Sequence, residues 1–340
     1  MAQMLLEQPI REANRIGYTV QGYTGLEERL HEIREQIRPV MQNIVTRYED
    51  DPTLRGVILN GLPAEGSYHR GSLISIASES MGGQRDIPLS ASGELFYWAT
   101  AWLDDIADKN TFRQSSQSVR TQIDDNIAMY ASNALYGIVL ETIAEQFETE
   151  PAKLAKILKY FAHNFHVINR GQAKDMFMAK MPIEEVSVSD YVNLIKETTG
   201  VDVATNLAIG CVSGGLNQET QNTVYQFGLR LGTLAQIRDD ILDYCKAKDG
   251  EGQYVIGKLP FRDAETGKKR LPLLLTQKSD LRVIPSDVYD RVEAEFINPR
   301  REEARSYLDS ANIGEKSKEL LGKILEYWSD IRIFQKLSSH

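Results

Sequence analysis

The segment "QIRDDILDY", Gln236 to Tyr244, places three aspartates in five positions inside an otherwise apolar run. Residues four apart lie on one face of a helix, so Asp239 and Asp243 are predicted to be neighbours. Like charges at this spacing destabilise an isolated helix by about 0.2–0.5 kcal/mol per pair. A helix that keeps such a pair beside core-type residues needs something to offset the repulsion, and a bound cation would do so.

A second copy of the same pattern stands upstream in "AWLDDIADKN", at Asp104, Asp105 and Asp108. Hard divalent cations prefer oxygen ligands, and Mg²⁺ typically takes one or two carboxylates together with substrate phosphates. A single DDxxD usually marks a solvated helix face. Two copies in apolar helices instead indicate two facing helices that hold Mg²⁺ between them, with a diphosphate completing the coordination shell.

Composition bounds the remaining possibilities. The chain has 340 residues, of which 42% are apolar and 26% charged, as in ordinary globular proteins. A net charge of −9 argues against nucleic-acid binding, because a phosphate backbone attracts a basic face. No run of 18 apolar residues is found, so no transmembrane helix is predicted. The N-terminus does not resemble a secretory signal, and Cys211 and Cys245 form no metal or disulfide pattern, so a reducing, cytoplasmic setting is expected.

Helical periodicity dominates the chain. From Thr24 to Val45 apolar residues recur in steps of three and four, and Pro39 is expected to kink this helix or end its first half. Few segments alternate as strands do, and no Pro/Gly/Ser-rich linker divides the sequence. We therefore expect an N-terminal arm, 1–23, and one all-α domain, 24–340, with loops at 60–72 and 245–272. Further helices are expected from Pro151 to about Met181, from Ser286 and from Glu315 to Lys336.

Four segments, one of which contains the second acidic motif, follow one another in a fixed order. They are "GQAKD" (Gly171 to Asp175), "YVNLIKETTG" (Tyr191 to Gly200), "AQIRDDILD" (Ala235 to Asp243) and "GKLPFRDAETGKKRLP" (Gly257 to Pro272). From about Gly66 to the C-terminus, the chain thus resembles the trans-isoprenyl diphosphate synthases, the polyprenyl synthetase family. The resemblance implies the class I isoprenoid synthase fold, a single large helical bundle with a central cavity, and a homodimer.

The resemblance also assigns roles to residues of this chain. It implies Mg²⁺ ligands, of which Asp104, Asp108 and Asp239 are the principal ones and Asp105, Asp240 and Asp243 support them. It implies contacts to the allylic diphosphate from Arg113, Lys258 and Lys268. It places Gln172 and Gln236 on the inner wall near the prenyl cation, and Thr199 is also predicted to bind the substrate. The residues predicted to be catalytic are Asp104, Asp108, Asp239 and Lys258.

The chain departs from the family where the acceptor, isopentenyl diphosphate, binds. Ser67, Gln114 and Tyr97 stand where the family has lysine, arginine and histidine, which leaves Arg70. On the allylic side, Thr198 replaces a lysine. Losing two cations removes charge-assisted contacts worth about 1.5–3 kcal/mol each. The pattern favours an acceptor without a diphosphate, or no external acceptor.

Three functions remain open. The first is an Mg²⁺-dependent prenyltransferase that ionises an allylic isoprenyl diphosphate and transfers the cation to isopentenyl diphosphate or an unusual acceptor. The second is a terpene cyclase-like synthase on the same fold, and the third a non-catalytic subunit of a heteromeric prenyl synthase. Six retained aspartates count against the third. In the family, small residues such as Ala99 and Thr100 before the first motif open the pocket, so a product longer than C15 is expected.

Overall fold

A computed structural model describes residues 24–63, 66–113, 116–246 and 260–332. The predicted arm, 1–23, lies outside these residues. The described part of the chain begins with α2 (Thr24–Tyr48), α3 (Pro52–Gly61) and α4 (His69–Ser78). The next helix, α5 (Ile87–Asp108), carries the first acidic motif. A two-stranded antiparallel hairpin, β1 (Phe112–Arg113) and β2 (Ser116–Gln117), follows and pairs Phe112 with Gln117. The predicted all-α class is confirmed.

The middle of the chain contains the longest helices. It comprises α6 (Val119–Gln122), α7 (Asp125–Gln146), α8 (Pro151–Ala179), a 3₁₀ turn η1 (Ile183–Glu185), α9 (Val188–Ile195), a π-helical turn η2 (Lys196–Gly200), α10 (Val201–Ser213) and α11 (Gln218–Leu242). Proline opens α8 as predicted, because the first helical turn needs no donor there. Asn217 caps α11 by accepting a hydrogen bond from the Thr220 N–H.

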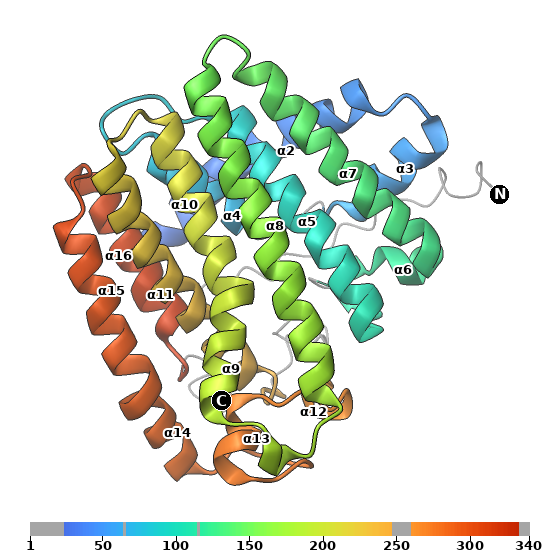
Figure 1. The fold of residues 1–340 in the computed structure, drawn as a ribbon, viewed down its shortest axis with the longest axis vertical. Coiled ribbons are helices and arrows are strands. Elements are labelled where there is room, and N and C mark those ends of the chain that lie inside the picture. Colours follow the sequence, from blue (N-terminus) through green and yellow to red (C-terminus); the bar gives the residue numbers. More distant parts are fainter. Residues whose placement is uncertain (1–23, 64–65, 114–115, 247–259, 333–340) are drawn as a thin grey trace.

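The C-terminal part is built from shorter elements. They are α12 (Arg262–Glu265), α13 (Leu271–Thr276), α14 (Ser286–Val292), a π-helical turn η3 (Glu293–Ile297), α15 (Asn298–Ser310) and α16 (Glu315–Ser329). In Figure 1, α9, α12 and α13 lie at the end of the bundle where α8 ends. Pro39 does not end α2, which continues to Tyr48, so the alternative of an early stop is wrong.

The bundle packs around α10. Every residue of this helix from Val201 to Val212 is buried, including Asp202. A helix that is buried on all sides needs partners on all sides. Its most extensive contacts are with α11 and α4, and α5 packs in turn on α4 and α7. Gly210 permits the close approach of α4, because a Cβ there would lie 2.5 Å from the Ile74 carbonyl oxygen.

One helix, α7, is long and apolar enough to cross a membrane by length and composition. Half of its most apolar window is buried inside the bundle, as in a core helix of a globular domain. This is weak evidence for a membrane span.

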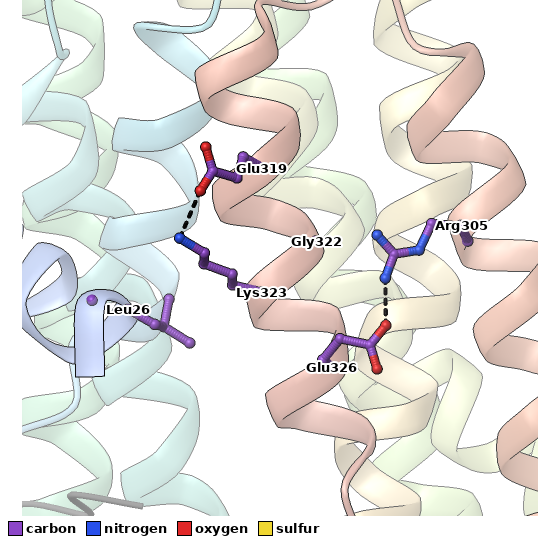
Figure 2. Close-up of a pocket in the computed structure, with 7 residues that line it drawn as sticks. Leu26, Arg305, Glu319, Gly322, Lys323 and Glu326 are labelled. Carbon is purple, nitrogen blue, oxygen red and sulfur yellow. Dashed lines mark hydrogen bonds and ion pairs between the residues drawn. The ribbon is translucent and has the colours of Figure 1, made fainter. Parts of the chain in front are cut away.

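A cavity of about 420 Å³ opens between α2, α15 and α16. Figure 2 shows that its charged side chains pair with one another, Glu319 with Lys323 and Arg305 with Glu326. None of the aspartates of the two motifs lines it. The central cavity expected from the family resemblance is a different feature and stays a prediction.

Candidate active site

The first acidic motif occupies the last turn of α5. This helix ends at Asp108 because Lys109 takes up a left-handed conformation with φ of 53° and donates its N–H to the Asp105 carbonyl. Asp105 points inward and is 1% exposed, whereas Asp104 and Asp108 are partly exposed. The predicted pair, Asp104 and Asp108, thus shares the accessible face of the turn.

The hairpin after α5 brings Arg113 back onto the motif. Its Nε lies 2.9 Å from both carboxylate oxygens of Asp105, and its Nη2 donates to Asp104 Oδ2 at 3.0 Å. Burial raises the pKa of Asp105, and the Arg113 guanidinium opposes that shift. The predicted diphosphate ligand Arg113 therefore lies beside the first motif, where a rigid guanidinium can meet a second anion.

Two side chains from distant elements contact the accessible face of this turn. Gln172 on α8 donates from Nε2 to Asp104 Oδ1 at 3.1 Å. Lys268, just before α13, donates from Nζ to Asp108 Oδ2. Burial and the neighbouring Asp104 charge raise the pKa of Asp108 to about 6, although Lys268 opposes the shift. The structure thus brings two predicted substrate ligands to the first motif.

The second motif is split between helix and loop. Asp239 is exposed, whereas Asp240 is 1% exposed and accepts hydrogen bonds from Tyr191 Oη at 2.7 Å and Gln236 Nε2 at 2.8 Å. Burial raises the pKa of Asp240 to about 7. Asp243 is buried and lies just past the end of α11, where its Oδ2 accepts from the Asp263 N–H at 3.3 Å. Asp239 and Asp243 therefore differ in exposure. The Asp243 N–H donates to the Asp239 carbonyl at 3.0 Å, so the two residues keep the predicted spacing of one helical turn.

A chain of ion pairs joins the two motifs. Lys268 lies between Asp108 and Asp175 of α8, with its Nζ 3.3 Å from Asp175 Oδ2. Arg270 forms two parallel hydrogen bonds to Asp175, at 2.9 and 3.0 Å. The same guanidinium lies 3.7 Å from Asp240 Oδ1 of the second motif. Both motifs are therefore held at one site by buried cations.

Sequence reasoning missed Arg270 and gave Asp175 no role. Asp175 ends the quoted "GQAKD" segment and Arg270 lies in the quoted loop, so a basic cluster facing an unassigned aspartate was the available signal. Among the described residues, no three His, Cys, Asp or Glu side chains form a ready metal site. The donors nevertheless fit a hard divalent cation, because they are carboxylates and one cation, the Lys268 ammonium, already sits among them.

Three further predicted residues that the structure describes, Thr199, Gln236 and Arg70, make contacts between helices. Thr199, in η2, donates from Oγ1 to Gln236 Oε1 on α11. Arg70 at the start of α4 donates from Nε to Asp202 Oδ2 at 2.7 Å and lies over the Tyr97 ring at 4.2 Å. The partner of Arg70, Asp202, was also missed. Lys258 and Gln114 lie outside the described residues.

Comparisons with known proteins show which family the chain resembles. The polyprenyl synthetase family model matches residues 51–292. A geranylfarnesyl diphosphate synthase of Aeropyrum pernix is 27% identical over 81% of this chain and 93% of its own. A geranylgeranyl diphosphate synthase of Sulfolobus acidocaldarius is 24% identical, over 79% and 89% respectively.

Solved structures share the fold. A geranylgeranyl pyrophosphate synthase has a TM-score of 0.77 at 20% identity, covering 88% of this chain and 98% of its own. A polyprenyl synthase of Caulobacter crescentus, complexed with calcium and isoprenyl diphosphate, has a TM-score of 0.71 at 21% identity, over 89% and 97%. The matched residues include both acidic motifs and the loop that carries Lys268 and Arg270. The chain belongs to the polyprenyl synthetase family and is a prenyltransferase.

Proposed function

We propose that this chain is an Mg²⁺-dependent prenyltransferase that ionises an allylic isoprenyl diphosphate and transfers the prenyl cation to an acceptor. The observation that carries the proposal is the chain of ion pairs from Asp108 through Lys268, Asp175 and Arg270 to Asp240. It links three acids and two buried cations from one motif to the other, and this supports a site for a metal-bridged diphosphate.

Asp104, Asp108 and Asp239 are the proposed principal ligands of Mg²⁺. Their carboxylates are at least partly accessible, whereas Asp105 and Asp240 are buried and hydrogen-bonded to Arg113 and to Tyr191 and Gln236. When bound, Mg²⁺ would act as a Lewis acid on the leaving diphosphate. Asp105, Asp240 and Asp243 support the site from within. The relative solved with calcium and isoprenyl diphosphate is consistent with oxygen ligands of this kind.

The cations at the site stabilise the negative charge that develops on the leaving diphosphate. Arg113 is held rigidly by Asp104 and Asp105, so its guanidinium is already oriented. Lys268 contacts Asp108 through a flexible ammonium, which can move from the carboxylate to a bound phosphate oxygen. We propose that Lys258 joins them from residues 247–259, outside the described part of the chain.

An aromatic cluster borders the proposed prenyl pocket one and two turns before Asp104. Thr100 hydrogen-bonds to the Tyr136 hydroxyl at 2.8 Å, and the Tyr136 ring packs edge-on to Phe96 and Phe165. The Phe96 and Tyr136 rings are buried and would keep out water, which would otherwise quench a prenyl cation. We propose that Tyr136 of α7, rather than the small residue Thr100, closes the pocket and limits the length of the prenyl chain that it holds.

We propose a homodimer through α7 and α8, which lie side by side on the near face in Figure 1. Both helices expose large apolar side chains, and such faces commonly pack against a partner. The exposed residues are Ile127, Tyr130, Leu140, Phe165, Met176 and Phe177. Sedimentation equilibrium tests this: a monomer at micromolar concentration would contradict it. A cytoplasmic location stays a prediction.

The terpene cyclase-like alternative is not favoured, because the curated relatives named here are diphosphate synthases. Incubation with Mg²⁺ and geranyl, farnesyl or geranylgeranyl diphosphate, with and without isopentenyl diphosphate, tests the proposal. Release of inorganic diphosphate from an allylic substrate is the expected result. Formation of a hydrocarbon without any acceptor would instead support the terpene cyclase-like function. No release from any of the three substrates, with tight binding to another synthase chain, would favour the non-catalytic subunit.

A further inference from the structure

A buried carboxylate neutralises the cation that remains on the acceptor side. Asp202 lies at the start of α10 and is 5% exposed, and its Oδ2 accepts from Arg70 Nε at 2.7 Å. Its other oxygen, Oδ1, accepts from Asn164 at 3.1 Å and from Asn206 at 3.2 Å. Three donors from three helices thus fix this carboxylate against Arg70. The Arg70–Asp202 pair therefore has no net charge with which to attract an incoming anion.

This pair lies next to the site of ionisation. Tyr97, Ala101 and Asp104 follow one another on a single face of α5, spaced by four and three residues. The Arg70 guanidinium covers the Tyr97 ring at 4.2 Å, so Tyr97 connects the pair to the first motif. Tyr97 lies seven residues before Asp104, or about 10 Å along the helix axis. An acceptor approaching a prenyl cation along this face meets Tyr97, Arg70 and Asp202.

The cluster also keeps one unused hydrogen-bond acceptor. Asn164 is 1% exposed and donates a hydrogen bond from Nδ2 to Asp202, while its Oδ1 has no hydrogen-bond partner among the described residues. A buried carbonyl oxygen without a partner is costly, so a ligand with an O–H or N–H group would stabilise it. A diphosphate has only acceptor oxygens at neutral pH and would face both Asn164 Oδ1 and the Asp202 carboxylate.

We propose that Asp202 is a specificity-determining residue that makes the acceptor pocket reject isopentenyl diphosphate and take an uncharged acceptor that donates a hydrogen bond. The proposal rests on the proposed function and specifies its acceptor. The Asp202 carboxylate repels a diphosphate, and this contributes to specificity as much as the loss of the cations that would attract one. Glu94, also buried, adds a second carboxylate near Arg70.

The transfer is balanced with such an acceptor. The C1–O bond of the allylic diphosphate breaks, and its electron pair leaves with the diphosphate. A lone pair of the acceptor oxygen or nitrogen then forms the new bond to C1. The proton of the acceptor passes to the released diphosphate, so no further reactant is needed.

Calorimetric titration of isopentenyl diphosphate, with EDTA present to remove metal, tests the proposal on the binding step alone. Wild type, Asp202→Asn and Asp309→Asn are compared; Asp309 is exposed on α15 and matches the change in charge. We expect Asp202→Asn to bind at least about tenfold more tightly than wild type, the step that 1.4 kcal/mol produces. Asp309→Asn should bind as wild type does. Adding Arg70→Gln to Asp202→Asn should remove the gain.

Two results would overturn the proposal: saturation of wild type at micromolar isopentenyl diphosphate, or equal or weaker binding by Asp202→Asn. The wild-type titration decides the matter if the variant does not fold. Release of diphosphate from an allylic substrate is measured separately. Its absence refutes the proposed function, whereas release combined with efficient elongation by isopentenyl diphosphate refutes the present inference alone.

Discussion

Replacing Arg270 by methionine should strongly destabilise the protein. The Arg270 side chain is 8% exposed and Asp175 is 6% exposed, so the pair is shielded from water. Two parallel hydrogen bonds of 2.9 and 3.0 Å join them. Removing one partner of a buried pair costs about 3–5 kcal/mol, because the other charge stays buried without compensation. Lys268 remains 3.3 Å from Asp175, so we expect a loss near the lower end, about 3 kcal/mol.

A double-mutant cycle separates the pair from its surroundings. Asp175→Asn alone should also destabilise, but Arg270→Met combined with Asp175→Asn should cost clearly less than the sum of the two single changes. Residues in one ion-pair network typically show coupling of about 0.5–3 kcal/mol. The measurement is the free energy of unfolding in urea for the four proteins. A cost for Arg270→Met below about 1 kcal/mol, with additive single changes, would refute the assigned bridge between the motifs.

Three further predictions follow from other parts of the bundle. Gly232→Ala should destabilise the protein by about 1–3 kcal/mol, because its Cβ would lie 2.4 Å from the Thr199 carbonyl oxygen. Gly56→Ala, where no atom lies within 4 Å of the new Cβ, should not destabilise it. The midpoints of urea unfolding test both variants. Burial raises the pKa of Glu94 from 4.5 to about 7, so the folded protein loses stability as the pH rises between these two values, by up to about 1.4 kcal/mol per pH unit. Glu94→Gln should make the free energy of unfolding depend less on pH in this range. An unchanged slope would contradict the prediction. Tyr136→Ala should let the protein use longer allylic substrates, seen as faster release of diphosphate from geranylgeranyl relative to farnesyl diphosphate, and an unchanged ratio would show that another residue closes the pocket.

Local patterns in the sequence predicted the helix starts at Thr24, Pro151 and Glu315, but the last helix ends at Ser329 rather than Lys336, and α4 begins inside the expected loop 60–72. Asp104 and Asp108 share a face because α5 remains helical to Asp108, as the spacing requires. The spacing also holds at the second motif, because Asp243 caps α11 with helical dihedral angles and donates its N–H to the Asp239 carbonyl at 3.0 Å. The spacing did not predict that Asp243 is buried while Asp239 is exposed. Burial depends on distant residues such as Asp263, whose N–H donates to Asp243.

Pairings between distant residues could not be predicted from local patterns. Arg270 and Asp175 are 95 positions apart, and Arg70 and Asp202 are 132 apart. Which buried charge meets which is decided by how α8, α10 and α13 pack, and helical periodicity contains no information about that. Asp202 was therefore given no role, although it forms a buried ion pair with Arg70. Sequence reasoning identified the loss of acceptor cations but not the carboxylate that neutralises the remaining one.

Metal-dependent release of diphosphate tests the central claim most directly. Wild type, Asp104→Asn, Asp239→Asn and the exposed control Asp309→Asn are each incubated with farnesyl diphosphate and Mg²⁺, and inorganic diphosphate is measured. If carboxylates of both motifs share the metal-bound leaving group, either site variant should lose about a hundredfold or more in rate, with its helical circular dichroism unchanged and the control fully active. Near-wild-type rates in Asp104→Asn and Asp239→Asn would contradict the account.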